Sequence, residues 1–238
     1  MVIIYIFSCM STATAQSTSS NEYRLKATFI YQFVNFIDGW KFEQEKDENN
    51  KSGKSSILLG IIGKDPFGDA FKPLTNKTVK DRKIEVKQFE GFSKLKIQDK
   101  DVTIHPEIEQ IKKCDMLFVY SSEQKYIDKI LNLIRNERIL TIADTDNFLE
   151  KGGNINFIIE KSSVRFKINI DGAKQAKMII RSKLLQLATQ IIMEDKVDDT
   201  LKKLKSSNHH FQPTIFSIFY TNPTIPNHSS GSILSLCP

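Results

Sequence analysis

The stretch that most constrains the fold covers residues 138–188, where a buried strand, a turn and an alternating segment follow one another. Residues 139–143 are almost continuously apolar, which predicts a strand covered on both faces. Gly152-Gly153 supplies the backbone freedom for a turn. Residues 155–160 and 164–170 then predict two strands of a ribbon, the second alternating strictly between apolar and polar side chains.

The rest of the chain predicts strands that alternate with helices. Apolar runs favour strands, and apolar side chains at helical spacing favour helices. The expected strands are residues 56–62, 83–89 and 116–120, and the expected helices are residues 22–38, 105–113, 123–135 and a closing helix over 179–193. Such alternation favours parallel strands with helices on both faces. We therefore predict one three-layer α/β/α domain over residues 22–193, with a mostly parallel sheet that an antiparallel C-terminal ribbon extends.

Charge and cysteine content exclude several classes of function. The chain of 238 residues has a formal net charge of +6, yet its basic and acidic residues are interleaved. Without a block of like charge, we expect no nucleic-acid partner. The cysteines Cys9, Cys114 and Cys237 lack the spacing of a metal site, so we predict no metal. Cys114, just before an apolar strand, is expected to be a buried free thiol.

Both ends of the chain differ from this domain. Residues 1–15 predict a cleaved signal peptide, because a short apolar run ends in Ala13-Thr14-Ala15 ahead of Gln16. A lipoprotein signal ending at Cys9 is the less favoured alternative. We therefore expect a periplasmic protein. Residues 194–238 predict a linker and a disordered tail, or the product of an altered reading frame, since no charged residue follows position 206.

Polar side chains follow several expected strands at their carboxyl ends, where open α/β sheets bind ligands. We predict a ligand edge made of Asp65, Phe67, Gly68, Ser121, Asp144 and Asp146. Asp144 and Asp146 could bind a cation or share a proton as a carboxylate pair.

Helix and turn capping is the simpler role for the same residues. Asp65 followed by Pro66 can begin a helix, and Ser121 with Gln124 fits a capping box. The turn after Gly63 has neither a dinucleotide fingerprint nor a phosphate-binding loop. Signatures of hydrolases and zinc peptidases are equally absent from the sequence. We predict no catalytic residues and no cofactor.

Several motifs in a fixed order resemble one family of exported proteins. They are EYRLKATFI (residues 22–30), GKDPFG (63–68), NKTV (76–79), CDMLFV (114–119) and the run from LTIAD (140–144) to IRSKLLQLA (180–188). The chain is similar to the YfiR family (DUF4154), small periplasmic α/β proteins that restrain a membrane-anchored diguanylate cyclase. The resemblance implies a regulatory binding protein whose release under envelope stress changes cyclic-di-GMP synthesis. Family members often carry a disulfide at the position of Cys114, but this domain offers Cys114 no partner.

The polar face of the ribbon is the predicted partner-binding surface. It carries Arg165, Lys167 and Asn169, and Arg181 and Lys183 stand at the start of the closing helix. The family uses this half for partner and self association. The resemblance therefore implies a membrane-anchored signalling partner, either a diguanylate cyclase or a sensor kinase, and allows a homodimer. A solvated polar face is the alternative, and a periplasmic small-molecule sensor or enzyme that uses the ligand edge is the alternative function.

Overall fold

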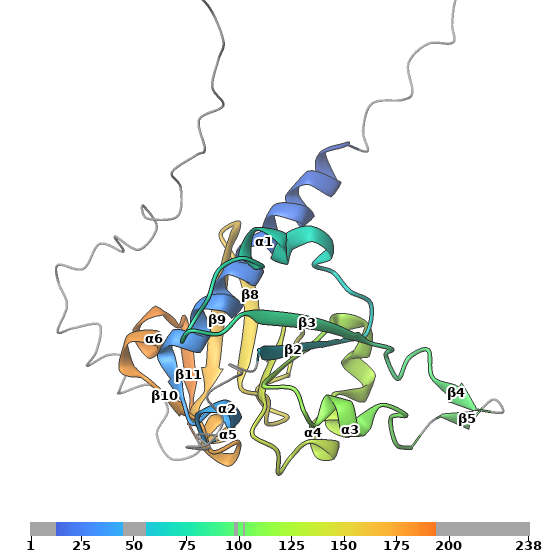
Figure 1. Cartoon of the computed structure of the whole chain (residues 1–238). Coiled ribbons are helices and arrows are strands. Elements are labelled where there is room, and N and C mark those ends of the chain that lie inside the picture. The colour runs from blue at the N-terminus through green and yellow to red at the C-terminus, as the bar shows by residue number, and fades with distance from the viewer. Residues whose placement is uncertain (1–12, 45–55, 98–99, 102, 194–238) are drawn as a thin grey trace, which may run out of the picture.

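Figure 1 shows the computed structural model, which describes residues 13–44, 56–97, 100–101 and 103–193. The described residues form a seven-stranded sheet in the order β11-β9-β8-β7-β6-β2-β3. Its strands are β2 (Ile57–Ile62), β3 (Ile84–Phe89), β6 (Met116–Val119), β7 (Leu140–Ala143), β8 (Ile155–Glu160), β9 (Ser163–Asn169) and β11 (Gln190–Ile192). β3, β2, β6, β7 and β8 are parallel, whereas β9 is antiparallel to β8 and parallel to β11. The predicted mostly parallel sheet with an antiparallel extension is confirmed.

Helices, of which α1 is the longest, and two-residue strands connect and flank this sheet in the described part of the chain. The helices are α1 (Ala13–Phe36), α2 (Lys41–Gln44), η1 (Gly68–Leu74), α3 (Ile108–Ile111), η2 (Ser121–Tyr126), α4 (Ile127–Leu133), α5 (Ile170–Gln175) and α6 (Ser182–Leu187). The small strands β1 (Ile37–Asp38) and β10 (Ile179–Ile180) pair with each other, as do β4 (Lys96–Ile97) and β5 (Lys100–Asp101). Among the described residues, no helix is both long enough and apolar enough to cross a membrane.

Two apolar clusters lie on the two faces of the sheet and define the three layers. On one face α1 buries Ile30, Phe33 and Val34 against the strands, and the Phe33 ring centroid lies 5.2 Å from that of Phe166 in β9. Figure 1 shows α1 crossing the sheet beside β8 and β9. On the other face α4 contributes Ile130 to a second cluster, which includes Leu117 of β6. The strands between the clusters are buried on both faces, which explains their apolar runs.

The predicted closing helix over residues 179–193 is wrong. The segment instead forms β10, the short helix α6 and β11. β10 pairs with β1 at Ile37↔Ile180, and the Arg181 amide donates to the Phe36 carbonyl. β11 pairs with β9 at Ile191↔Ile168. Because the backbone groups of both ends find partners elsewhere in the fold, the helical spacing of the apolar side chains does not produce one continuous helix.

The predicted first helix over residues 22–38 is α1, which begins earlier, at Ala13, and gives way to β1 at Ile37. The predicted signal peptide and the predicted tail over residues 194–238 lie outside the described residues, except that Ala13 to Ala15 belong to α1. Both remain predictions.

Candidate functional site

The chain order of the strands reverses at β2. β3 follows β2 in the chain and lies on one side of it, whereas the next strand of the sheet, β6, lies on the other side. In open α/β sheets, ligands bind outside the carboxyl ends of the strands at such a reversal. The loops after β2 and β6 carry the predicted ligand residues Asp65, Phe67, Gly68 and Ser121.

A side chain of the protein itself fills the space between the loops that follow β2 and β3. Glu123 is completely buried, and its carboxylate accepts hydrogen bonds from the Ser93 amide (3.1 Å), the Ser93 hydroxyl (2.5 Å) and the Ser122 hydroxyl (3.1 Å). A Cβ atom added at Gly91 would overlap this carboxylate, and one at Gly63 would overlap the Ser122 hydroxyl. The two glycines therefore leave room for an internal carboxylate at this point of the sheet.

The loops themselves differ from the predicted helix starts. The predicted capping box of Ser121 and Gln124 is wrong, because η2 begins at Ser121 without a side-chain cap and Ser121 is exposed. The Asp65 side chain accepts from the Phe67 amide at 2.8 Å, which forms a turn, and helix η1 begins only at Gly68. Phe67 is buried, with its ring centroid 4.8 Å from that of Phe118.

Asp144, at the carboxyl end of β7, is the centre of a buried polar cluster. Its Oδ2 atom accepts from the Tyr23 hydroxyl at 2.8 Å and from the Lys26 ammonium at 2.7 Å. The side chains of Lys26 and Asp144 are only 3% and 7% exposed. Lys26 also forms an ion pair with Glu22 at 2.6 Å. One cation thus joins two carboxylates where α1 passes over the sheet.

The second oxygen of Asp144 is different. Oδ1 is buried, and no hydrogen-bond donor of the described residues reaches it. Asp146, the predicted second member of a carboxylate pair, is exposed. Burial and then the Asp144 carboxylate raise the pKa of Tyr23 above its ordinary value of 10.0, so the hydroxyl stays protonated and donates. Lys26 and Tyr23 were not predicted as site residues, although the spacing of Glu22 and Lys26 at i and i+4 indicates an ion pair.

The predicted partner surface remains a prediction, but the strand register shows which face of the sheet two of its residues occupy. The cross-strand register places Arg165 opposite Ile158 of β8, and Lys167 opposite Gln190 of β11. We call these four residues the ribbon face. It lies on the side of the sheet opposite α1, because the alternate residue Phe166 packs in the α1 cluster. Arg165 is exposed and Lys167 is half-buried, and neither forms an ion pair within the described part of the chain.

Asn169 does not belong to this exposed surface, which corrects the prediction. The residue is only 8% exposed. The amide nitrogen donates to the Leu149 carbonyl at 2.9 Å, and the amide oxygen accepts from the Gly172 amide at 2.9 Å and caps α5. Asn169 lies on the same face of β9 as Arg165 and Lys167, as predicted, but α5 and the turn at Leu149 cover the sheet at this point. It is therefore a structural residue.

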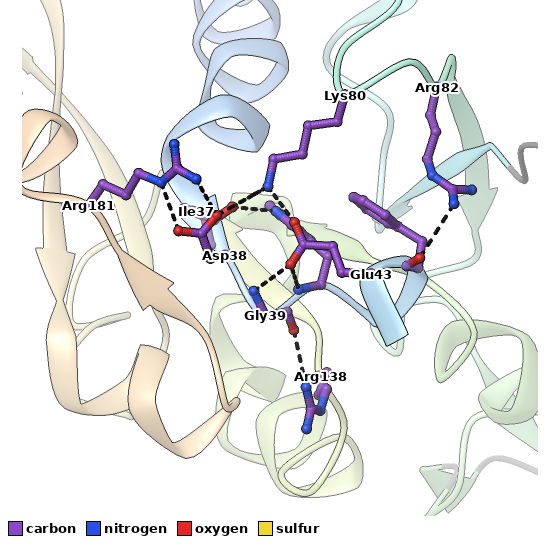
Figure 2. A network of polar contacts seen from close by, with 10 residues as sticks. Ile37, Asp38, Gly39, Glu43, Lys80, Arg82, Arg138 and Arg181 are labelled. Atoms are coloured by element: carbon purple, nitrogen blue, oxygen red, sulfur yellow. Dashed lines mark hydrogen bonds and ion pairs between the residues drawn. The ribbon is translucent and has the colours of Figure 1, made fainter. Parts of the chain in front are cut away.

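Arg181 holds the C-terminal segment to the end of α1. Its guanidinium donates to both carboxylate oxygens of Asp38, each at 2.7 Å, and this pairing lowers the pKa of Asp38. Figure 2 shows Lys80 reaching the same group of residues, with its ammonium 2.9 Å from the Ile37 carbonyl and 2.5 Å from Glu43. The network joins three segments that are distant in sequence. Arg181 is therefore committed to this network, whereas Lys183 in α6 is exposed.

The remaining chemistry of the described residues is limited. Cys114 is a buried free thiol, and burial raises its pKa to about 12. His105 is buried between the Glu90 carbonyl and the Glu107 amide. Within the described part of the chain, no three side chains of His, Cys, Asp or Glu lie close enough together to hold a metal ion.

Comparison with solved structures finds distant likeness to two proteins. One is a conserved domain protein from Vibrio cholerae, with 9% sequence identity, a TM-score of 0.44, and coverage of 71% of this chain and 60% of that one. Another is the ABC domain in complex with L-Trp from Streptococcus pneumoniae, with 11% identity, a TM-score of 0.43, and coverage of 72% and 60%. The chain thus spans about 60% of the length of these two proteins. No curated protein matches the sequence significantly.

Comparison with protein families finds a family that matches most of this chain. The sequence matches the DUF4154 family, described as YfiR/HmsC-like, over residues 23–189. The match covers α1 from residue 23 onward and every later element of the fold except β11. It supports a role as a periplasmic regulator and agrees with the resemblance found in the sequence motifs. The chain belongs to the YfiR/HmsC-like family.

Proposed function

We propose that this protein is an exported regulator that docks on the periplasmic domain of a membrane-anchored signalling protein, such as a diguanylate cyclase, and represses it. Family membership supports the regulatory role. The observation that carries the docking surface is the ribbon face, where Arg165 and Lys167 stand on neighbouring outward positions of β9 without an ion-pair partner among the described residues.

The ribbon face suits an acidic partner surface. Arg165 lies beside the half-buried Ile158, so an apolar contact and a charge are offered together. Arg165 and Ile158 stand on paired strands, which hold the two side chains in place more firmly than a loop would. Rim charges of this kind mainly steer association and fix the orientation of the partner. Exposed Lys183 of α6, the helix directly before β11, adds a third cation in this half of the chain.

The test is crosslinking of the purified protein to membranes, followed by identification of integral proteins recovered with it. The variant Arg165→Glu/Lys167→Glu reverses two charges of the ribbon face. The control Lys113→Glu/Lys125→Glu makes the same change in net charge at two exposed lysines outside the ribbon face. We expect the ribbon variant to lose at least about tenfold of the recovered partner, and the control to keep it. Recovery of no integral signalling protein by the wild type, or equal recovery by both variants, contradicts the proposal.

A second candidate function is a periplasmic small-molecule sensor that binds its ligand at the ligand edge. It is favoured by the buried Asp144 Oδ1, which has no donor among the described residues and could accept a hydrogen bond from an amino or hydroxyl group. Calorimetry with amino acids and nucleotides tests it. Heat of binding that Asp144→Asn abolishes supports this candidate, and silence with all of these compounds removes it.

A further inference from the structure

β3 is the outermost strand of the sheet at the end opposite β11 and β9. It is six residues long, and β2 is its neighbour on the inner side. Figure 1 shows β3 beside β2. An edge strand of this length presents a row of backbone groups to which another strand can pair.

The direction of each backbone group follows from the pairing with β2. The Lys83 carbonyl accepts from the Ile57 amide at 2.8 Å, and the Phe89 carbonyl accepts from the Gly63 amide at 3.2 Å. Odd-numbered residues of β3 therefore bond inward. The N–H and C=O groups of Ile84, Val86 and Gln88 point outward, and no backbone group of the described residues pairs with them.

The side chains of this strand are complementary to a second, antiparallel copy. A two-fold axis at Val86 pairs Val86 with itself and Ile84 with Gln88, so that all outward N–H and C=O groups are satisfied. Glu85 then lies opposite Lys87 of the second copy, and Lys87 opposite Glu85. These are the non-hydrogen-bonded pairs, whose side chains approach most closely. Glu85 is exposed and accepts a hydrogen bond from the Ser56 hydroxyl, and Lys87 is 36% exposed with its ammonium 3.6 Å from Glu107. Solvated contacts of this kind contribute little, so both side chains can exchange them for a pair across the axis.

We propose that two copies of this chain associate through antiparallel pairing of their β3 strands about Val86, with two reciprocal Glu85–Lys87 ion pairs across the axis. Val86 is 42% exposed, one of few large apolar side chains exposed to this degree in the described residues, and lies on the axis. The proposal does not depend on the ribbon face, which is at the other end of the sheet.

The charges of β3 also differ from those of an edge strand that is protected against pairing with an identical strand. Protective edges carry like charges, commonly lysines, which repel an identical strand. Here the two charges adjacent to the axis have opposite signs and stand two residues apart, so self-pairing in this register brings only opposite charges together. Pairing shifted by two residues would place Glu85 against Glu85 or Lys87 against Lys87, which favours the stated register.

Sedimentation velocity of the purified protein over a range of concentrations tests the proposal. We expect a monomer–dimer equilibrium that weakens as salt is added. Glu85→Lys gathers four lysines at the axis, and Lys87→Glu gathers four glutamates. Each variant alone should weaken dimerisation at least about tenfold. An equimolar mixture of the two should form a heterodimer, and the double variant Glu85→Lys/Lys87→Glu should recover the homodimer.

Val86→Pro gives an independent test. The Val86 N–H points outward, so proline removes no bond to β2 but blocks the central pair of the dimer. We expect a folded monomer, with the circular dichroism spectrum of the wild type. A wild type that stays monomeric at all concentrations overturns the proposal. So does a dimer that both charge variants and Val86→Pro leave intact, or a mixture of the charge variants that forms no heterodimer while the wild type dimerises.

Discussion

Replacement of Lys26 by methionine tests whether the cluster under α1 is an essential ion pair. The ammonium lies 2.7 Å from Asp144 and 2.6 Å from Glu22, with 3% of the Lys26 side chain exposed. Methionine keeps the apolar stem and leaves Asp144 buried without its cation. Breaking a buried pair from one side costs about 3–5 kcal/mol. Since a domain of this kind is stable by about 5–15 kcal/mol, we expect Lys26→Met to lose a large share of the free energy of unfolding.

Asp144→Asn should cost less, about 1–3 kcal/mol, because Lys26 keeps its ion pair with Glu22 and asparagine still offers an acceptor to Tyr23. Urea denaturation followed by circular dichroism measures both values. Lys72→Met is the matched control, since its ion pair with Asp69 is almost fully solvated and surface pairs contribute about 1 kcal/mol or less. A loss below about 1 kcal/mol for Lys26→Met would refute the reasoning.

Three further predictions concern pH and packing. Because the folded state raises the pKa of Tyr23 above 10.0, its stabilisation is complete below that pH and is lost as pH rises above it. Urea titrations between about pH 9 and 11 should therefore show a shallower alkaline loss for Tyr23→Phe, and equal slopes contradict this. The folded state lowers the pKa of Asp38 below 3.8, so its stabilisation is present above that pH and is lost on further acidification. Asp38→Asn should reduce the acid dependence of stability below about pH 4, and superimposable acid curves would count against the pairing with arginine. Gly91→Ala should cost about 1–3 kcal/mol in thermal unfolding, because the new Cβ overlaps the Glu123 carboxylate. At Gly68 nothing lies within 4 Å, so Gly68→Ala should cost only the strain of its positive φ of 48°; a larger loss there than at Gly91 contradicts the packing argument.

The sheet could be predicted from the sequence because each strand carries its own signal. Residues 139–143 are apolar without interruption, and β7 is buried on both faces. The alternation of Val164, Phe166 and Ile168 likewise gave the inward face of β9, which packs on α1. In both segments the local pattern and the tertiary environment agree, so a local rule is sufficient.

The prediction of a closing helix failed because the conformation of residues 179–193 depends on backbone groups that are distant in sequence. Ile180, Leu184 and Ile191 recur at helical spacing, yet Ile180 pairs with Ile37 and Ile191 with Ile168. No pattern within the segment reports that an unpaired edge of β9 is available. Edge pairing competes with helix formation for the same N–H and C=O groups, and in a short segment the tertiary partners decide.

Candidate site residues were harder to predict, because the exposure of a residue depends on which other elements of the fold cover it. Asn169 lies on the same face of β9 as Arg165 and Lys167, but α5 lies over it. Its side-chain oxygen caps that helix by accepting from the Gly172 amide. Asp144 was predicted as a residue of the ligand edge, but its ion-pair partner, the buried Lys26 of α1, was not predicted. The docking of a helix on a sheet brings these side chains together, and a sequence pattern gives the faces of each element without their relative position.

The two proposed surfaces lie at opposite ends of one sheet, and this has a consequence for regulation. Five strand spacings separate β9 from β3 in the order of the sheet. A dimer formed through β3 adds one more spacing and then five again, so its two ribbon faces stand about 50 Å apart along a continuous sheet at about 4.8 Å per strand. Membrane-anchored partners that are themselves dimeric could then be bound at two points, which raises the apparent affinity by about 10²–10⁴ without any new contact. Under this arrangement the monomeric Glu85→Lys variant should bind membranes that contain the partner much more weakly than the wild type, although its ribbon face is unchanged. Equal binding by the two would show that a single ribbon face is sufficient and that the β3 contact has no part in docking.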